Sequence, residues 1–222
     1  MNSNESFFAA IKQGDLAQLK KLLEADASLA RARSESGESP ILTAIFYGRT
    51  EIKEFLLSRG IELDIFEAAA TGNLGRVTQL VSQDASLAQA FSSQGFPALA
   101  LAAFCAHLDI VKFLIRKGAH VNAVARNATG YTALTASVTS GQVEITAALL
   151  AAGAQANYRY GQGHSPLHSA AASGNLRLVT LLLDHGGDPA ATMDDGQTPI
   201  SLAESKGHKE VAALLKQRAA TA

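Results

Sequence analysis

The residues with the most obvious chemical potential are two histidines spaced four positions apart. His164 and His168 could meet on one face of a helix and hold a metal ion there. A zinc site needs a third and a fourth ligand of suitable type, and none lies nearby in the sequence. We therefore expect no metal site and no cofactor.

The single cysteine, Cys105, precedes His107 by two residues and offers a second chemistry. A thiol and an imidazole could act as nucleophile and base, but no third group is evident that would orient the base. A lone buried cysteine behaves instead as a small hydrophobic side chain. We expect a protein that is not an enzyme, and an enzyme with an unrecognised thiol or metal site is the alternative.

Two glycine-containing segments resemble ligand-binding loops only in part. Gly161–Pro166 begins like a dinucleotide fingerprint, but it lacks the third glycine and the preceding strand. Met193–Gly196 suggests a calcium loop, yet the alternating oxygen ligands and the closing glutamate are out of place. Both segments are typical of turns.

The composition excludes several classes of partner. Nineteen basic and twenty acidic residues give a formal net charge of −1, so no overall field attracts nucleic acid. The chain is 47% apolar, which favours a packed core over disorder. No run reaches the ~18 apolar residues of a membrane-spanning helix, and residues 1–6 lack the pattern of a secretory signal. A single cysteine suits a reducing compartment, so we expect a cytoplasmic protein without membrane contact.

The elements that would position such residues follow an internal period. In a recurring sequence motif, two small and two variable residues precede a glycine, and a polar residue and an apolar-rich run follow it. The separations between successive markers are 34, 24, 34, 35, 33 and 33 residues, so five of six agree on one period. The markers are Gly14, Gly48, Gly72, Ala106, Gly141, Gly174 and Gly207, where Ala106 replaces the expected glycine.

Each period predicts two short helices. In the sixth, Pro166 stands in a first helical turn, and Gly174 ends that helix. A second helix follows with an apolar stripe that includes Leu178 and Leu182, and it ends at Gly186. Such a pair cannot bury its apolar face alone, so neighbouring pairs must stack.

These motifs resemble the ankyrin repeat, and the resemblance extends over nearly the whole chain. It implies an all-α, ankyrin-type repeat solenoid of about seven helix-turn-helix units with short hairpin fingers. It also implies a structural, hydrogen-bonded role for His168. The segments that carry it are Ser165–Ala171, Gly174–Asn175, Leu181–Leu183, Gly196–Ile200 and Val111–Asn122.

We expect a single domain over residues 1–222. The first and last units carry many charged residues, as the polar ends of a solenoid need. The units are expected at approximately 5–36, 37–62, 63–94, 95–129, 130–162, 163–195 and 196–218.

The one short separation indicates a duplication and a lost finger. Asp26–Ala30 reappears as Asp84–Ala88 at an offset of 58 residues, which indicates that units three and four are a copy of units one and two. After Gly118, 23 residues lead to the next marker, whereas only 12 follow Gly60. We predict that the row of fingers has a gap between units two and three.

The resemblance implies a concave face made of finger tips and the ends of the first helices. The two residues before each marker should be exposed there, and two of these pairs carry aromatic side chains, Phe46 with Tyr47 and Phe104 with Cys105. Phe46 recurs as Phe104 at the 58-residue offset, so inheritance is sufficient to explain it. The other pairs are Lys12-Gln13, Ala70-Thr71, Thr139-Ser140, Ala172-Ser173 and Ser205-Lys206.

Two adjacent predicted fingers give a second signal for binding. From residue 118 to residue 176 the only charged residues are Arg126, Glu144 and Arg159, and three of the four tyrosines lie in the same stretch. Binding hot spots are enriched in Tyr and Arg and lie in charge-depleted surroundings. Alternatively, the tyrosines pack between neighbouring fingers and only hold them in register. The residues expected to contact a partner in these fingers are Arg126, Tyr131, Tyr158, Arg159, Tyr160 and His164.

The sequence thus predicts a non-catalytic protein–protein interaction module. We expect a monomer that binds a protein partner, rather than nucleic acid or membrane, through the concave face and finger tips of units four to six. This prediction depends on the family resemblance as well as on the missing catalytic groups, because a fold alone does not determine function. A regulatory or inhibitory subunit of another protein is a further alternative.

Overall fold

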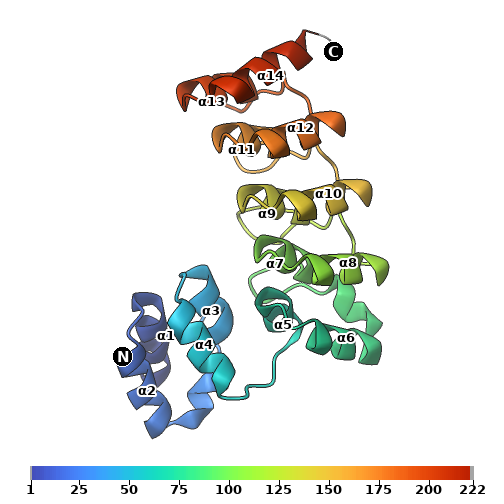
Figure 1. Cartoon of the computed structure of the whole chain (residues 1–222). Coiled ribbons are helices and arrows are strands. Elements are labelled where there is room, and N and C mark those ends of the chain that lie inside the picture. The colour runs from blue at the N-terminus through green and yellow to red at the C-terminus, as the bar shows by residue number, and fades with distance from the viewer. Residues whose placement is uncertain (1, 221–222) are drawn as a thin grey trace.

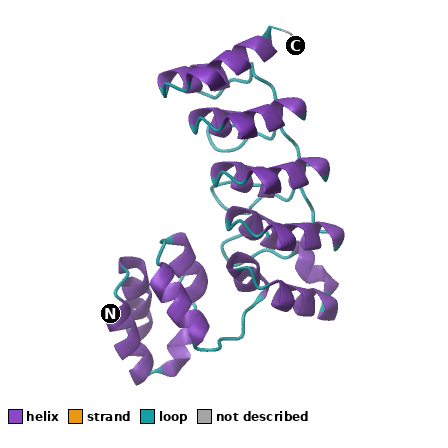
Figure 2. Ribbon diagram, viewed as in Figure 1, coloured by secondary structure: helices purple, strands orange, loops and turns teal. Residues whose placement is uncertain are grey.

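The computed structural model describes residues 2–220, which form α-helices joined by short loops (Figure 2). Those residues contain fourteen α-helices, two 3₁₀ helices and only two isolated β-bridges, so the expected all-α fold is confirmed. The elements are α1 (Ser3–Gln13), α2 (Leu16–Ala25), η1 (Ala27–Arg31), α3 (Pro40–Phe46), α4 (Thr50–Ser58), α5 (Ile65–Thr71), α6 (Leu74–Gln83), η2 (Ala85–Gln89), α7 (Ala98–Phe104), α8 (Leu108–Arg116), α9 (Ala133–Thr139), α10 (Val143–Ala151), α11 (Pro166–Ala172), α12 (Leu176–Asp184), α13 (Pro199–Ser205) and α14 (Lys209–Ala219).

Local sequence explains where the helices begin and end. Ser39 caps the start of α3, where its side chain accepts a hydrogen bond from the backbone N–H of Leu42, and Pro40 occupies the first turn. The marker residues end the first helix of each pair in left-handed backbone. Ala106 adopts this conformation with a φ of 67°, and it is the only non-glycine residue in the described range with a positive φ. Because Cβ disfavours that conformation, alanine costs about 1 kcal/mol there.

From α5 to α14, consecutive helix pairs stack into a column, here defined as residues 65–219 (Figure 1). The first helices α5, α7, α9, α11 and α13 pack on one another, and the second helices α6, α8, α10, α12 and α14 do the same. Apolar side chains between the two layers are fully or almost fully buried, among them Leu99, Leu134, Leu149 and Leu167. This two-layer core is the main source of stability for helices too short to persist alone.

Two asparagines join successive pairs within the column. The side chain of Asn122 donates to the carbonyl oxygen of Gly153 (3.0 Å) and accepts from the backbone N–H of Gln155 (2.9 Å). Asn157 repeats both bonds one unit later, with the carbonyl of Gly186 (2.8 Å) and the N–H of Asp188 (2.9 Å). Each asparagine thereby satisfies two backbone groups of the next unit.

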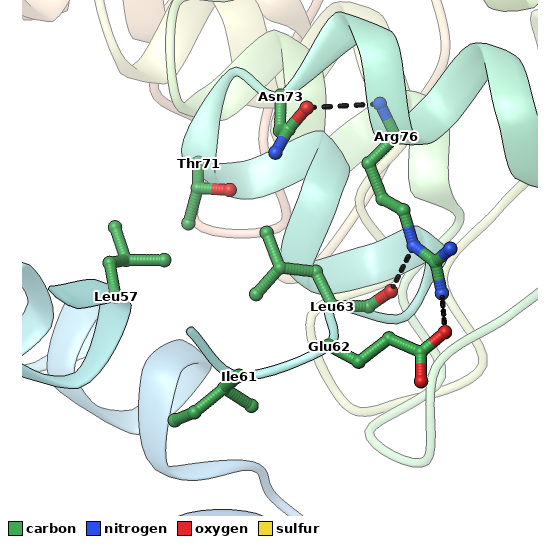
Figure 3. Close-up of a pocket in the computed structure, with 7 residues that line it drawn as sticks. All are labelled: Leu57, Ile61, Glu62, Leu63, Thr71, Asn73 and Arg76. Atoms are coloured by element: carbon green, nitrogen blue, oxygen red, sulfur yellow. Dashed lines mark hydrogen bonds and ion pairs between the residues drawn. The ribbon is translucent and has the colours of Figure 1, made fainter. Parts of the chain in front are cut away.

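The first two helix pairs form an N-terminal block, residues 3–58, that lies to one side of the column (Figure 1). Residues 59–64, here called the joint, connect the block to the column without a finger. Helix α3 packs on α5, whereas α4 and α6 make at most marginal contact with each other. Between them lies a joint cavity of about 400 Å³ (Figure 3). Its lining residues are Leu57, Ile61, Glu62, Leu63, Thr71, Asn73 and Arg76.

The finger expected to be absent after unit two is absent, but the predicted gap in the row is closed. Ser93 in the finger at residues 90–97 donates from Oγ to the carbonyl oxygen of Gly37 (2.7 Å), and Gln94 donates to that of Ser36 (3.3 Å). The finger at residues 32–39 therefore contacts the finger at 90–97 directly. Because no finger lies between them, these two fingers are next to each other, and the block is tilted relative to the column (Figure 1).

One arginine adds a charged link across the joint. Arg33 lies 3.1 Å from Asp64 and 3.4 Å from Glu67, measured between side-chain nitrogen and oxygen. Glu67 is almost completely buried, so Arg33 supplies the positive charge that a buried carboxylate needs. None of the described helices is long and apolar enough to cross a membrane.

Candidate functional site

The inner face of the molecule is formed by the ends of the first helices and by the fingers at residues 32–39, 90–97, 119–132, 153–165 and 187–198. Phe46 at the end of α3, Tyr47 after it and Phe104 at the end of α7 are exposed here, at 37%, 47% and 40%. The expected exposure of Ala70 is wrong, because Leu42 and Leu101 pack over it and leave it 5% exposed.

An aromatic cavity of about 140 Å³ opens on this face. Phe46 and Phe96 both line it, with ring centroids 5.8 Å apart. Almost all of its wall is carbon. The lining residues are Phe46, Phe96, Ala100, Leu101, Phe104, Thr129, Tyr131 and Ala136.

The missing finger after unit two explains how residues from both sides of the joint reach this cavity. Ala70 occupies in α5 the position that Phe46 and Phe104 occupy in α3 and α7, but it is buried and does not line the cavity. The missing finger after α4 lets the finger at residues 90–97 reach α3, which brings Phe96 against Phe46.

The inner face carries very little charge along five consecutive first helices. In α3, α5, α7, α9 and α11 the only acidic or basic side chains are Glu67 and His168, and both are buried. A surface without exposed charge loses little solvation energy when a partner covers it. Depletion of charge with enrichment of aromatic residues is typical of the centre of a protein–protein interface.

The tyrosines of the fingers contact one another across units. The rings of Tyr131 and Tyr160 meet edge to face with centroids 5.2 Å apart. Tyr160 is buried, and its hydroxyl lies 2.5 Å from the Oγ of Ser169. Burial raises the pKa of Tyr160 above its usual value. Tyr158 is half-buried beside the finger at residues 119–132, so the tyrosines also hold neighbouring fingers in register.

The two finger arginines differ in their engagement. Arg159 donates to the carbonyl oxygen of Thr192 (2.8 Å) and pairs with Asp194 (3.3 Å) in the next finger. Arg126 lies over the ring of Phe91, with its guanidinium carbon 3.8 Å from the ring centroid. Both side chains are exposed and retain donors for a partner, although Arg159 would have to share its guanidinium.

The two histidines lie together, but His168 has no nitrogen free for a metal ion. Its Nδ1 accepts from the backbone N–H of Ser165 (3.1 Å), so its Nε2 is the nitrogen that donates to the carbonyl of Gln197 (3.3 Å). Burial lowers the pKa of His168 and keeps the ring neutral. His164 stacks on Tyr160 at 5.8 Å instead. Among residues 2–220 no three His, Cys, Asp or Glu side chains group closely enough to hold a metal.

Cys105 and His107 do not form a nucleophile–base pair. His107 donates from Nε2 to the carbonyl oxygen of Ala70 (3.0 Å) and so ties α8 to the end of α5. Burial raises the pKa of the Cys105 thiol to about 11, with a smaller opposing effect from Lys53. The thiol therefore stays protonated near neutral pH, whereas the nucleophile in thiol catalysis is the thiolate.

Comparison with protein-family models gives a match to ankyrin repeats at residues 65–160 and 149–221. These segments together cover more than half of the chain. The protein belongs to the ankyrin-repeat family. Comparison with curated proteins finds no match. Ankyrin repeats generally bind other proteins and are typically non-catalytic.

The family match begins where the column begins, at the first residue of α5. The N-terminal block, which contributes Phe46 to the aromatic cavity, lies outside the matched ankyrin segments. Sequence reasoning singled out Phe46, Phe104 and Tyr131 but missed Phe96 as their neighbour. A signal for Phe96 was present, because it is an apolar residue in the finger next to the deleted one.

Proposed function

We propose that this protein is a non-catalytic protein–protein interaction module of seven ankyrin units, each formed by one helix pair. A protein partner lies along the inner face and contacts the finger tips of units four to six. The observation that supports this most directly is the aromatic cavity beside first helices that carry no exposed charge. The cavity extends the proposed surface back to Phe46 of unit two.

Each predicted contact residue has a definite part in this proposal. Phe46, Phe104 and Tyr131 form the apolar centre, and Tyr47 extends it. Tyr160 is buried, and its ring packs against Tyr131 and His164. At the finger tips, Arg126, Tyr158, Arg159 and His164 supply polar contacts around that centre.

The test compares partner capture by variants that share a fold. Phe46→Ser with Phe104→Ser removes the apolar centre, whereas Leu74→Ser with Leu176→Ser removes two side chains of equal exposure, 37% and 39%, from the second-helix layer. We expect one dominant partner, identified by mass spectrometry from native lysate, to be retained by wild type and the leucine variant and lost by the phenylalanine variant. Truncation of a central aromatic anchor costs about 2 kcal/mol or more in binding.

A second arm addresses the finger tips. Tyr158→Ala with Arg159→Ala should weaken capture of the same partner while the helical circular dichroism signal stays unchanged. If capture survives both the phenylalanine and the finger-tip substitutions, the partner does not bind at the inner face.

A further inference from the structure

A second cavity adjoins the aromatic one on the inner face. Its volume is about 250 Å³, and we call it the basic cavity. Residues that are adjacent in the sequence line different cavities. Ile45 and Cys105 line the basic cavity, and their neighbours Phe46 and Phe104 line the aromatic cavity. The lining residues are Ala44, Ile45, Gly48, Arg49, Thr50, Lys53, Ala70, Thr71, Cys105 and His107.

The size of the aromatic cavity matches one apolar side chain. An engineered apolar cavity of about 150 Å³ in a protein core stays dry and accepts a benzene ring. The aromatic cavity has about 140 Å³ and a similar apolar wall. A Phe or Leu side chain therefore fits it, whereas a charged side chain would lose its hydration there without gaining a partner.

The basic cavity has the opposite chemistry. Arg49 and Lys53 line it, and none of its lining residues is acidic. Arg49 is held in place because its Nε and Nη2 donate to the carbonyl oxygen of Lys12, at 2.9 and 2.6 Å. Lys53 pairs with Glu54, but the carboxylate of Glu54 is largely exposed and does not line the cavity. The neutral Cys105 thiol adds no negative charge. The site therefore offers positive charge without an internal counter-charge.

We propose that the two cavities together bind one internal segment of a partner protein, in which a Phe or Leu side chain fills the aromatic cavity and a nearby Asp or Glu side chain pairs with Lys53 and Arg49. This inference rests on the proposed function and specifies the chemistry of the partner. Phe46 and Lys53 belong to the N-terminal block, whereas Phe104 and His107 belong to the column. The bound segment therefore lies across the joint and contacts both parts of the molecule.

The probe is a random library of 12-residue peptides displayed on phage and selected against the full-length wild-type protein. We expect the enriched peptides to share a Phe or Leu with an Asp or Glu within a few positions. Enriched peptides are then synthesised with a fluorescent label, and their affinity is measured by anisotropy. Phe104→Ser should abolish binding, and Leu176→Ser should leave it unchanged.

A charge exchange tests the acidic half of the motif. Lys53→Glu should weaken the acidic peptide about tenfold, because like charges then face each other. The same peptide with Lys in place of its acidic residue should bind Lys53→Glu more tightly than it binds wild type. Lys209→Glu, on the exposed surface of α14, makes the same change in net charge away from the site and should have little effect.

The outcomes separate this inference from the proposed function. If the enriched peptides need Phe104 but carry no acidic residue, the proposed pairing of an Asp or Glu with Lys53 and Arg49 is wrong. The proposed binding of a partner at the inner face is not affected by that result. Equal losses from Lys53→Glu and Lys209→Glu also overturn that pairing, because the effect is then one of overall charge. The absence of any enriched peptide overturns the inference, while the capture of a folded partner tests the proposed function separately.

Discussion

The joint and the junctions of the column connect the same kind of unit, but the units pack together more extensively in the column than at the joint. Between α9/α10 and α11/α12, both helix layers continue, and Asn157 bonds two backbone groups of the next unit. At the joint only the first-helix layer continues, and a cavity separates α4 from α6. The difference indicates that the length of the finger determines whether the second helix of one unit packs on the second helix of the next.

A single position shows how the joint lost the column's pattern. Asn122 and Asn157 each stand four residues after a glycine, at Gly118 and Gly153, and each reaches forward to the next unit. Asp64 stands four residues after Gly60, but α5 begins immediately after it. Its carboxylate therefore caps α5 by accepting from two backbone N–H groups within its own unit. Asp64 thus caps its own helix in place of a forward link to backbone groups, and its contact with another unit is the ion pair with Arg33.

The largest predicted difference concerns packing. Leu149→Ala in α10 removes a side chain with no exposure and should destabilise the protein by about 2–5 kcal/mol. Leu57→Ala removes a half-buried side chain that already borders the joint cavity, so no new void is created and the loss should be about 1 kcal/mol. Urea titrations followed by circular dichroism measure both. Equal losses would show that the joint is packed as tightly as the column.

The second prediction compares two equivalent marker positions, one on each side of the joint. Ala106→Gly should stabilise the column by about 1 kcal/mol, because glycine adopts left-handed backbone without the cost that a Cβ imposes. Gly48→Ala in the block should cost a similar amount, since a Cβ there meets no atom within 4 Å and only the backbone conformation is strained. The midpoints of thermal unfolding should shift in opposite directions, and shifts of the same sign would exclude this explanation.

The smallest predicted effect is a dependence on pH that arises in the column. Burial lowers the pKa of His168, so below about pH 6.5 the unfolded chain binds a proton that the folded protein resists. This contribution to stability is complete above that pH and decreases as the pH falls toward the lower folded pKa. Protonation at Nδ1 would also break the bond from the N–H of Ser165. Wild type should therefore lose more stability than His168→Gln between about pH 7.5 and 5.5. Identical losses would show that His168 is not the cause.

Much of the fold was predictable because it depends on local patterns. The spacing of the marker residues predicted short helix pairs, and Ala106 was recognised as a marker although it is not glycine. The lost finger after Gly60 also followed from counting residues. The exposure of Ala70 was predicted wrongly, because Leu42 and Leu101, which cover it, come from units on either side.

By itself, the sequence determined the repeat, the helices and which residues end them, because these depend on interactions between residues close together in the chain. It also determined the uncharged character of the first helices and the two phenylalanines at their ends. Only the tertiary structure decided that α4 and α6 stay apart, that the fingers on either side of the joint close over it, and that Phe96 lies against Phe46. The finger contact joins Ser93 to Gly37, 56 positions apart, and Phe96 follows Phe46 by 50 positions. These contacts depend on how far the N-terminal block tilts, and that tilt is settled by the packing of whole units.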